Sequence, residues 1–157
     1  MDPQGNPRHP TPSSHQTAVL LIAHGSRERS ANADLHELAA RLAAAEEYPI
    51  VQACFLELAE PDIPTGGDRC VARGATRVLM IPYFLSAGVH LRRDLTAARD
   101  ELSRRHPKVE FRLGSPLGPH PLLDSLVAAR IRELEGTGSV SPTNPRHVAM
   151  ESVRPTE

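Results

Sequence analysis

Ala18-Val19-Leu20-Leu21-Ile22-Ala23-His24-Gly25-Ser26-Arg27 is the most informative stretch of the sequence, because six apolar residues lead directly into a polar turn. The apolar run does not alternate with polar residues, which is typical of a strand that is covered on both faces. Gly25 permits a sharp turn, and Ser26 or Ser30 can cap a helix that follows. The stretch therefore predicts a central strand of a parallel sheet, with His24 at its carboxyl end.

Three further strands are predicted downstream, and a helical pattern follows each strand. The four predicted strands are residues 18–23, 50–58, 77–82 and 109–113. The third is continuously apolar like the first, whereas the fourth alternates apolar and charged residues, as a half-exposed edge strand does. Apolar residues at helical spacing predict helices that end near Tyr48-Pro49, Gly74, His106-Pro107 and Gly136. Because Pro64 and Gly66-Gly67 lower helix propensity, an irregular first turn is expected in the second helix, about Asp62 to Arg73.

Strands that alternate with helices predict a three-layer, flavodoxin-like α/β fold with a four-stranded parallel sheet and right-handed crossovers. With the first and third strands in the centre, the expected strand order is 2-1-3-4. Ligands of such sheets bind beyond the carboxyl ends of the strands, where the strand order reverses. Here that point lies between the first and third strands.

The length of 157 residues predicts one folded domain. Residues 1–17 are polar and rich in proline, so we predict a disordered N-terminal arm. The folded domain is predicted at residues 18–135, and the aperiodic residues 136–157 are predicted to form a disordered C-terminal tail.

Composition argues against several classes of partner. A net charge of −1 with 24% charged residues provides no overall basic field for nucleic acid or an anionic membrane. Aromatic residues make up 3% of the chain and there is no Trp, which argues against stacking platforms for single-stranded nucleic acid. The polar start lacks the pattern of a signal peptide and no segment approaches 18 consecutive apolar residues, so a cytoplasmic location is expected.

The two cysteines, Cys54 and Cys70, lie in apolar stretches without Cys-x-x-Cys spacing. We therefore predict small buried thiols rather than a disulfide or a zinc site.

Three polar residues are predicted at the carboxyl ends of neighbouring strands. His24 follows the first strand, Glu57 ends the second, and His90 closes the loop after the third. Imidazole nitrogens bind divalent transition metals, and a carboxylate can add an oxygen ligand or accept protons. An ordinary catalytic zinc site would also use such residues, but the His-Glu-x-x-His spacing of a zinc peptidase is absent. A weak, open metal site that passes its ion on is the favoured hypothesis, and ordinary structural histidines are the alternative.

The loops that carry the histidines are also basic. Arg27 and Arg29 follow His24, and Arg92 and Arg93 follow His90, each pair next to a predicted helix N-terminus. Such positions favour anions, so a ligand with several carboxylates fits. The alternative is a solvated helix start in which the arginines pair with acidic neighbours, Glu28 and Asp94.

Residues 18 to about 135 resemble the short CbiX-type sirohydrochlorin cobaltochelatases and the related SirB-type ferrochelatases of the class II chelatase family. The resemblance rests on three segments in this order and spacing, Leu21-Ile22-Ala23-His24-Gly25-Ser26-Arg27, Phe55-Leu56-Glu57-Leu58-Ala59-Glu60-Pro61 and Pro82-Tyr83-Phe84-Leu85-Ser86-Ala87-Gly88-Val89-His90.

The resemblance implies a chelatase half-domain, a lyase that inserts a divalent metal into the tetrapyrrole sirohydrochlorin with release of two protons, on the route to cobalamin or sirohaem. It implies that His24 and His90 bind the metal and accept protons, and that Glu57 assists them as a catalytic residue. Ser26, Arg27, Arg92 and Arg93 are then expected to bind the substrate carboxylates. The metal, Co²⁺, Fe²⁺ or Ni²⁺, would be a substrate, and no organic cofactor is expected.

A single half-domain offers one wall to a macrocycle, which needs a cleft, so a symmetric homodimer is expected. A non-catalytic carrier of metal or tetrapyrrole that uses the same residues is the main alternative function. A flavodoxin-like nucleotide or phosphate binder is a weaker one, because no Gly-rich phosphate loop follows the first strand.

Overall fold

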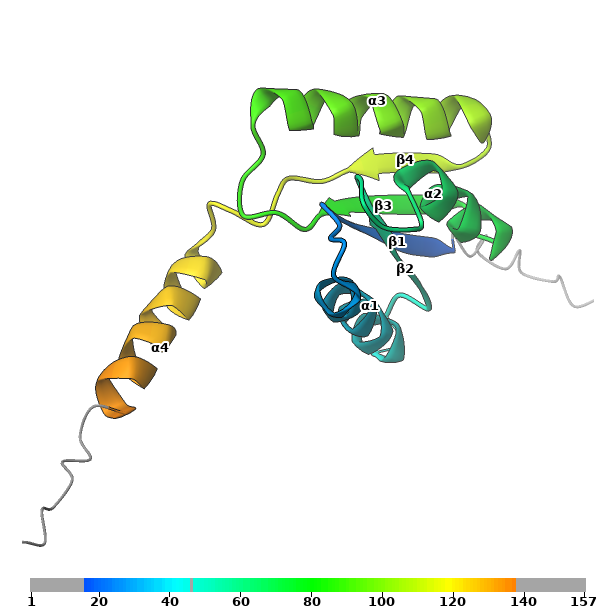
Figure 1. Cartoon of the computed structure of the whole chain (residues 1–157). Coiled ribbons are helices and arrows are strands. Elements are labelled where there is room, and N and C mark those ends of the chain that lie inside the picture. The colour runs from blue at the N-terminus through cyan, green and yellow to red at the C-terminus, as the bar shows by residue number, and fades with distance from the viewer. Residues whose placement is uncertain (1–15, 46, 138–157) are drawn as a thin grey trace, which may run out of the picture. The chain divides into compact units, whose positions relative to one another are not determined.

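A computed structural model of the chain describes residues 16–45 and 47–137, and its elements are shown in Figure 1. The chain divides into two units, Met1–Pro119 and His120–Glu157, which we describe separately. Most of the predicted arm and tail lies outside the described residues. The exceptions are residues 16 and 17 at the start, and residues 136 and 137 at the end of the last helix.

The first unit contains a four-stranded parallel sheet in the order β2-β1-β3-β4, as predicted. Its strands are β1 (Thr17–Ala23), β2 (Ile50–Phe55), β3 (Arg77–Pro82) and β4 (Glu110–Leu113). The central strand β1 pairs with two neighbours, so that Leu21 lies beside Ala53 on one side and Ile81 on the other. At the edge, β4 buries Phe111 and exposes Glu110 and Arg112, which agrees with its alternating sequence.

Helices cover both faces of this sheet. One face packs on α1 (Arg29–Ala44), which contributes Leu35 and Ala39 to a core with Phe55. The opposite face packs on α2 (Ile63–Ala72) and α3 (Val89–Arg105), as Figure 1 shows. The three-layer arrangement explains why the apolar run of β1 is continuous: alternate side chains enter the two different cores.

Helix α2 is regular from its first turn, so the expectation of an irregular start was wrong. Asp62 caps the helix by accepting a hydrogen bond from the backbone N–H of Thr65 at 2.8 Å, and Pro64 lies in the first turn, where its missing N–H is tolerated. Close packing explains why both of these positions are glycine. A Cβ at Gly66 would lie 2.8 Å from Cys54 Cβ, and one at Gly67 would lie 2.5 Å from Leu102 Cδ2.

Two other boundaries differ from the sequence predictions. Helix α1 ends at Ala44, before Tyr48-Pro49. Strand β2 ends at Phe55, because the chain bends after it and Leu58 adopts a left-handed conformation with φ 62°. The stop predicted at Gly74 is confirmed, since this residue follows α2 with φ 95°.

The described part of the second unit is α4 (Pro121–Thr137), which passes through Gly136 instead of ending there. The sequence predicted an apolar stripe on this helix. Its large apolar side chains are exposed in the structure: Leu122, Leu126, Val127, Ile131 and Leu134.

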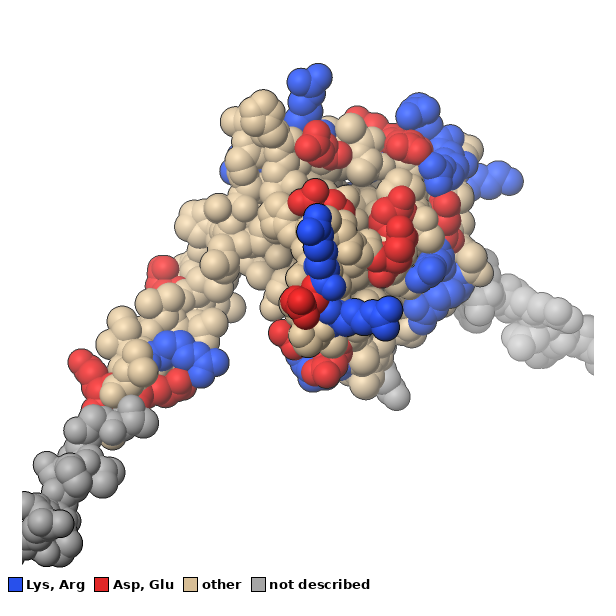
Figure 2. Space-filling model, viewed as in Figure 1, with Lys and Arg blue, Asp and Glu red and all other residues tan. Residues whose placement is uncertain are grey.

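The surface and the cysteines also follow the sequence. Acidic and basic side chains are interspersed on the face shown in Figure 2. No helix among the described residues has the length and apolar character needed to span a bilayer. Cys54 and Cys70 are free and buried, as predicted. Burial raises the pKa of the Cys70 thiol to about 11 and shifts that of Cys54 upward still further.

Candidate active site

Two loops leave the carboxyl edge of the sheet side by side and are joined by hydrogen bonds. The backbone N–H of Leu56 donates to the Ala23 carbonyl at 2.9 Å, and that of Glu57 donates to the His24 carbonyl at 3.0 Å. Gly25 makes this approach possible: its φ is 92°, and a Cβ there would clash with the Glu57 carbonyl oxygen. The pairing of β1 with β2 thus continues into the loops and holds His24 beside Glu57.

His24 and Glu57 line one cavity of about 370 Å³. Leu56 belongs to the same wall, and Leu91 and Asp94 of α3 complete the lining. The His24 ring packs edge-on against Phe84, with 4.8 Å between ring centroids and 75° between ring planes. Both polar side chains remain exposed, so a ligand can reach them.

His90 occupies a different position. It is the second residue of α3 and is exposed, and it does not belong to the lining of this cavity, although the next residue, Leu91, does. Over residues 16–45 and 47–137, no group of three or more His, Cys, Asp or Glu side chains is placed to hold a metal ion. The structure therefore brings together His24 and Glu57, and leaves the role of His90 as a prediction.

Asp94 is a cavity residue to which the sequence analysis gave no role other than an ion-pair partner. It lies four residues after His90, so the two side chains share one face of α3. The side chain of Asp94 makes no hydrogen bond or ion pair with any other described residue, and it lines the same cavity as Glu57. The signal that could have identified it is the helical spacing of His90, Leu91 and Asp94.

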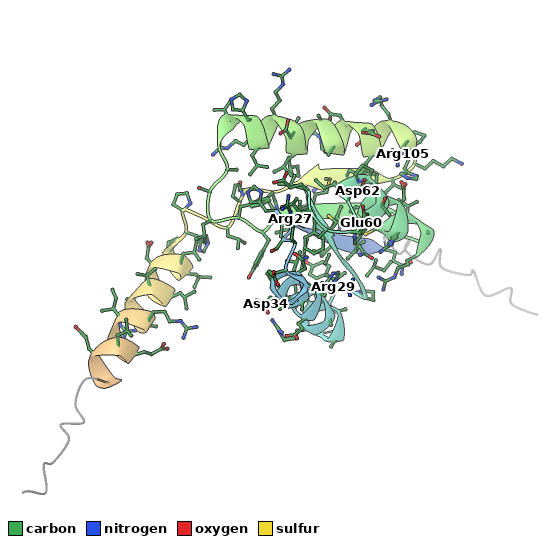
Figure 3. The ribbon with its side chains drawn as sticks, in the orientation of Figure 1. Arg27, Arg29, Asp34, Glu60, Asp62 and Arg105 are labelled. Atoms are coloured by element: carbon green, nitrogen blue, oxygen red, sulfur yellow. The ribbon has the colours of Figure 1, made fainter. Side chains whose placement is uncertain are left out.

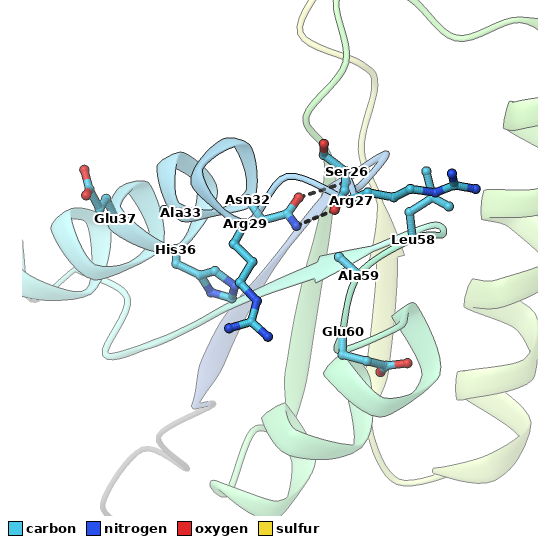
Figure 4. Close-up of a pocket in the computed structure, with 10 residues that line it drawn as sticks. All are labelled: Ser26, Arg27, Arg29, Asn32, Ala33, His36, Glu37, Leu58, Ala59 and Glu60. Atoms are coloured by element: carbon cyan, nitrogen blue, oxygen red, sulfur yellow. Dashed lines mark hydrogen bonds between the residues drawn. The ribbon is translucent and has the colours of Figure 1, made fainter.

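The predicted carboxylate-binding residues divide between two places. Ser26 and Arg27 line a second cavity of about 630 Å³, between the start of α1 and the loop after β2 (Figure 4). Arg92 donates from Nε to the Ala87 carbonyl at 3.0 Å, which ties it to the loop before α3. Arg93 is exposed on α3.

The expected capping of α1 by serine is wrong. The N-cap residue is Glu28, whose side chain makes no capping hydrogen bond, and Ser26 Oγ accepts a hydrogen bond from the Glu28 N–H outside the helix. Nor do the arginines pair with their acidic neighbours, because no ion pair in the described part of the chain joins them to Glu28 or Asp94. The arginines are exposed to solvent, as the alternative of a solvated helix start expected, but the ion pairs it expected are not formed.

An imidazole and two carboxylates line one open cavity, although the three are not placed as ligands of a single ion. Imidazole nitrogens and carboxylate oxygens are ligands for divalent metal ions. Imidazole and carboxylate groups can also act as general bases. Leu56 and Leu91 give the cavity an apolar part that suits a ring face.

Comparison with known proteins identifies the relatives of this fold. The family model CbiX matches residues 18–134. A chloroplastic sirohydrochlorin ferrochelatase of Arabidopsis thaliana is 35% identical over 114 residues, which cover 73% of this chain and 51% of that protein. A sirohydrochlorin cobaltochelatase of Priestia megaterium is 35% identical over 124 residues, which cover 78% of this chain and 40% of that protein. The chain thus spans about half the length of these curated relatives or less.

Solved structures show the same likeness. A CbiX protein from Marinobacter aquaeolei VT8 superposes with a TM-score of 0.66 and 30% identity, covering 77% of this chain and 98% of that one. SirB from Bacillus subtilis with Fe³⁺ superposes with a TM-score of 0.69 and 29% identity, covering 76% of this chain and 47% of that one.

Proposed function

This chain belongs to the CbiX family, and on that basis we propose that it inserts a divalent metal ion into the tetrapyrrole sirohydrochlorin. The observation that carries the proposal is the shared cavity of His24 and Glu57, which the joined loops hold next to each other. Co²⁺, Fe²⁺ and Ni²⁺ are the candidate substrate ions, because imidazole and carboxylate ligands suit all three. The product would enter cobalamin or sirohaem synthesis.

Insertion requires the ion to arrive as two pyrrole protons leave. His24 is proposed to hold the ion or to accept a proton through its imidazole nitrogens. Glu57 and Asp94 face the same cavity and offer two further proton acceptors. His90, on the face of α3 that carries Asp94, is proposed to contribute a second nitrogen ligand when the substrate is bound.

The carboxylates of sirohydrochlorin are proposed to bind the basic residues that surround these loops. Ser26 and Arg27 are available on the α1 side. Arg93 and the terminal nitrogens of Arg92 are available at the start of α3. Guanidinium groups suit this task because they bind carboxylates through two parallel hydrogen bonds.

We further propose a symmetric homodimer. A single half-domain offers one wall to a macrocycle, and a symmetric second copy would supply the other wall of a cleft. Leu85 and Val89, in the loop and first turn before His90, are 69% and 82% exposed, which is unusual for large apolar side chains that face only water. Light scattering should give twice the mass of the chain at assay concentration, and a monomer with full activity would contradict this proposal.

A carrier that binds metal or tetrapyrrole without turnover is the second candidate, because an open site serves both purposes. The two functions differ in stoichiometry. Purified protein is mixed with excess sirohydrochlorin and Co²⁺, Fe²⁺ or Ni²⁺, without any organic cofactor, and the change in absorbance is followed. An enzyme forms many equivalents of metallated product above the uncatalysed rate, whereas a carrier stops at one equivalent for each site.

A further inference from the structure

The second cavity, on the α1 side of the joined loops, carries a charge imbalance. Of its two carboxylates, Glu37 lies 3.8 Å from Arg41, and Glu60 accepts a hydrogen bond from the Asp62 N–H at 3.2 Å. Its two guanidinium groups, on Arg27 and Arg29, make no ion pair or hydrogen bond with any other described residue. The acidic side chains are thus engaged elsewhere, and the basic ones are free to bind a ligand.

The wall of this cavity is held in place by a side-chain amide. Asn32 Oδ1 accepts a hydrogen bond from the Ser26 N–H at 2.9 Å, and Asn32 Nδ2 donates to the Ser26 carbonyl at 2.8 Å. Figure 4 shows these two bonds, together with the side chains of Arg29 and His36 that also line the cavity. Arg29 is the first residue of α1, so the helix and the amide together fix where its side chain starts.

The two cavities are close enough to serve one ligand. Glu57 lines the cavity that also contains His24, and the next residue, Leu58, lines the second cavity. The Cα atoms of these two residues are about 3.8 Å apart, because they are neighbours in the chain. Leu58 is 54% exposed and has a left-handed backbone, a conformation that branched and bulky residues rarely adopt outside functional loops. A flat ligand that lies over His24 can therefore extend a side group past Leu58.

We propose that this cavity binds a peripheral carboxylate of the tetrapyrrole, with Arg29 as the main contact and Arg27 as a second one. The proposal rests on the proposed function, because it takes the substrate to be a polycarboxylate. It adds Arg29 to the carboxylate-binding residues proposed on the α1 side, and it places them in a cavity separate from the one that His24, Glu57 and Asp94 line. Arg29 is accordingly a binding residue that governs affinity, and the metal-side residues govern the rate.

The test measures binding of metal-free sirohydrochlorin, so that it does not depend on turnover. Absorbance or fluorescence titration gives the Kd for the wild type, Arg29→Ala, Arg29→Lys and Arg69→Ala. Arg69, on α2, is the matched control, because it is exposed, lacks a side-chain partner among the described residues and lines neither cavity. We expect Arg29→Ala to raise the Kd about tenfold, Arg29→Lys to raise it less, and Arg69→Ala to leave it unchanged.

Two further measurements separate this proposal from the insertion activity. The methyl ester of the tetrapyrrole lacks the negative charges, so the wild type and Arg29→Ala should bind it equally. In steady-state assays, Arg29→Ala should raise KM with kcat retained. Equal Kd values for the wild type and a folded Arg29→Ala variant, or no binding by the wild type, would overturn the carboxylate subsite. Binding that depends on Arg29 without turnover would support the subsite and overturn only the insertion activity.

Discussion

The two edges of the sheet treat their charged side chains in opposite ways. Toward the amino edge, at the end of α3, Arg105 pairs with Asp68 at 2.7 Å and with Glu101 at 2.5 Å, and His106 contacts Asp68 at 2.7 Å. At the carboxyl edge, Arg27, Arg29 and Asp94 have no partner among the described residues. Figure 3 shows Arg105 at the far end of α3 from the loop that carries Arg27.

The paired charged side chains at the amino edge stabilise the fold, whereas the unpaired ones at the carboxyl edge can bind a ligand. Burial would raise the pKa of Asp68, but hydrogen bonds from His106 and Arg105 outweigh it and hold this pKa below its usual range. Such a carboxylate is satisfied within the protein. The partnerless groups of the opposite edge line the two cavities, so they are available to a ligand.

The strongest test of this difference between the two edges replaces one histidine at each edge with alanine. His24→Ala should lower the rate of metal insertion by about 10²-fold or more, because a ligand and proton acceptor is lost, with little change in the melting temperature. His106→Ala should retain the insertion rate and lower the melting temperature. The measurements are initial rates by absorbance and thermal unfolding by circular dichroism. An equal loss of activity in both variants would contradict the proposal that only the carboxyl edge binds the ligand.

A second comparison tests the joined loops through their glycines. Gly25→Ala places a Cβ against the Glu57 carbonyl at a positive φ, and should cost about 2 kcal/mol of unfolding free energy together with activity. Gly88→Ala is the control, because nothing lies within 4 Å of its Cβ position and its φ is −67°. Gly is preferred to Ala at this N-cap, but Ala also restricts the unfolded chain, so the net change in unfolding free energy should be less than about 1 kcal/mol. Urea unfolding measures both, and an equally mild effect at Gly25 would contradict the close approach of the loops.

A smaller effect is expected for Asp94→Asn, which keeps the shape of the side chain and removes its charge. Insertion should slow about tenfold at neutral pH, since one proton acceptor of the cavity is lost. Asp34→Asn is the matched control, because Asp34 is exposed on α1, has no partner among the described residues and lines neither cavity. Rate profiles against pH for both variants decide the point. Coinciding profiles would remove Asp94 from the site.

The smallest expected effect concerns the helix cap beside the site. Hydrogen bonds from the side chain and the backbone N–H of Thr65 lower the pKa of Asp62. A lowered folded-state pKa means that the cap stabilises the protein above the unfolded pKa of about 3.9 and that this contribution is lost as the pH falls through the folded value. Asp62→Ala should cost about 1 kcal/mol at pH 7 and less at pH 3, as measured by urea unfolding. A cost independent of pH would argue against an ionised cap.

Much of the first unit could be predicted from the sequence, because the patterns have direct physical causes. The continuous apolar run of residues 18–23 reflects two cores, and the alternation in β4 reflects one. Strand order follows from which runs are continuous. The placement of His24 and Glu57 at one edge follows from the parallel direction of their strands.

The rest depends on features that a pattern does not encode. Whether His90 enters the cavity depends on the path of the loop between β3 and α3, which has no periodicity. The division of the carboxyl edge into two cavities depends on the hydrogen bonds between backbones at His24 and Glu57. The exposure of apolar side chains on α4 could not be predicted, because an apolar stripe on a helix indicates burial but does not identify the surface that the stripe packs against.

The paired glycines of α2 have a consequence for engineering. A methyl group at Gly66 would meet Cys54 of the sheet, and one at Gly67 would meet Leu102 of α3, so each would push α2 away from a different neighbour. The loop from β2 is anchored to that helix, because the Phe55 N–H donates to the Pro61 carbonyl at 2.9 Å, one residue before the Asp62 cap. A substitution of either glycine that is chosen to raise helix propensity would therefore shift α2 and the loop that carries Glu57. Mutant libraries designed to stabilise the protein should leave both glycines unchanged.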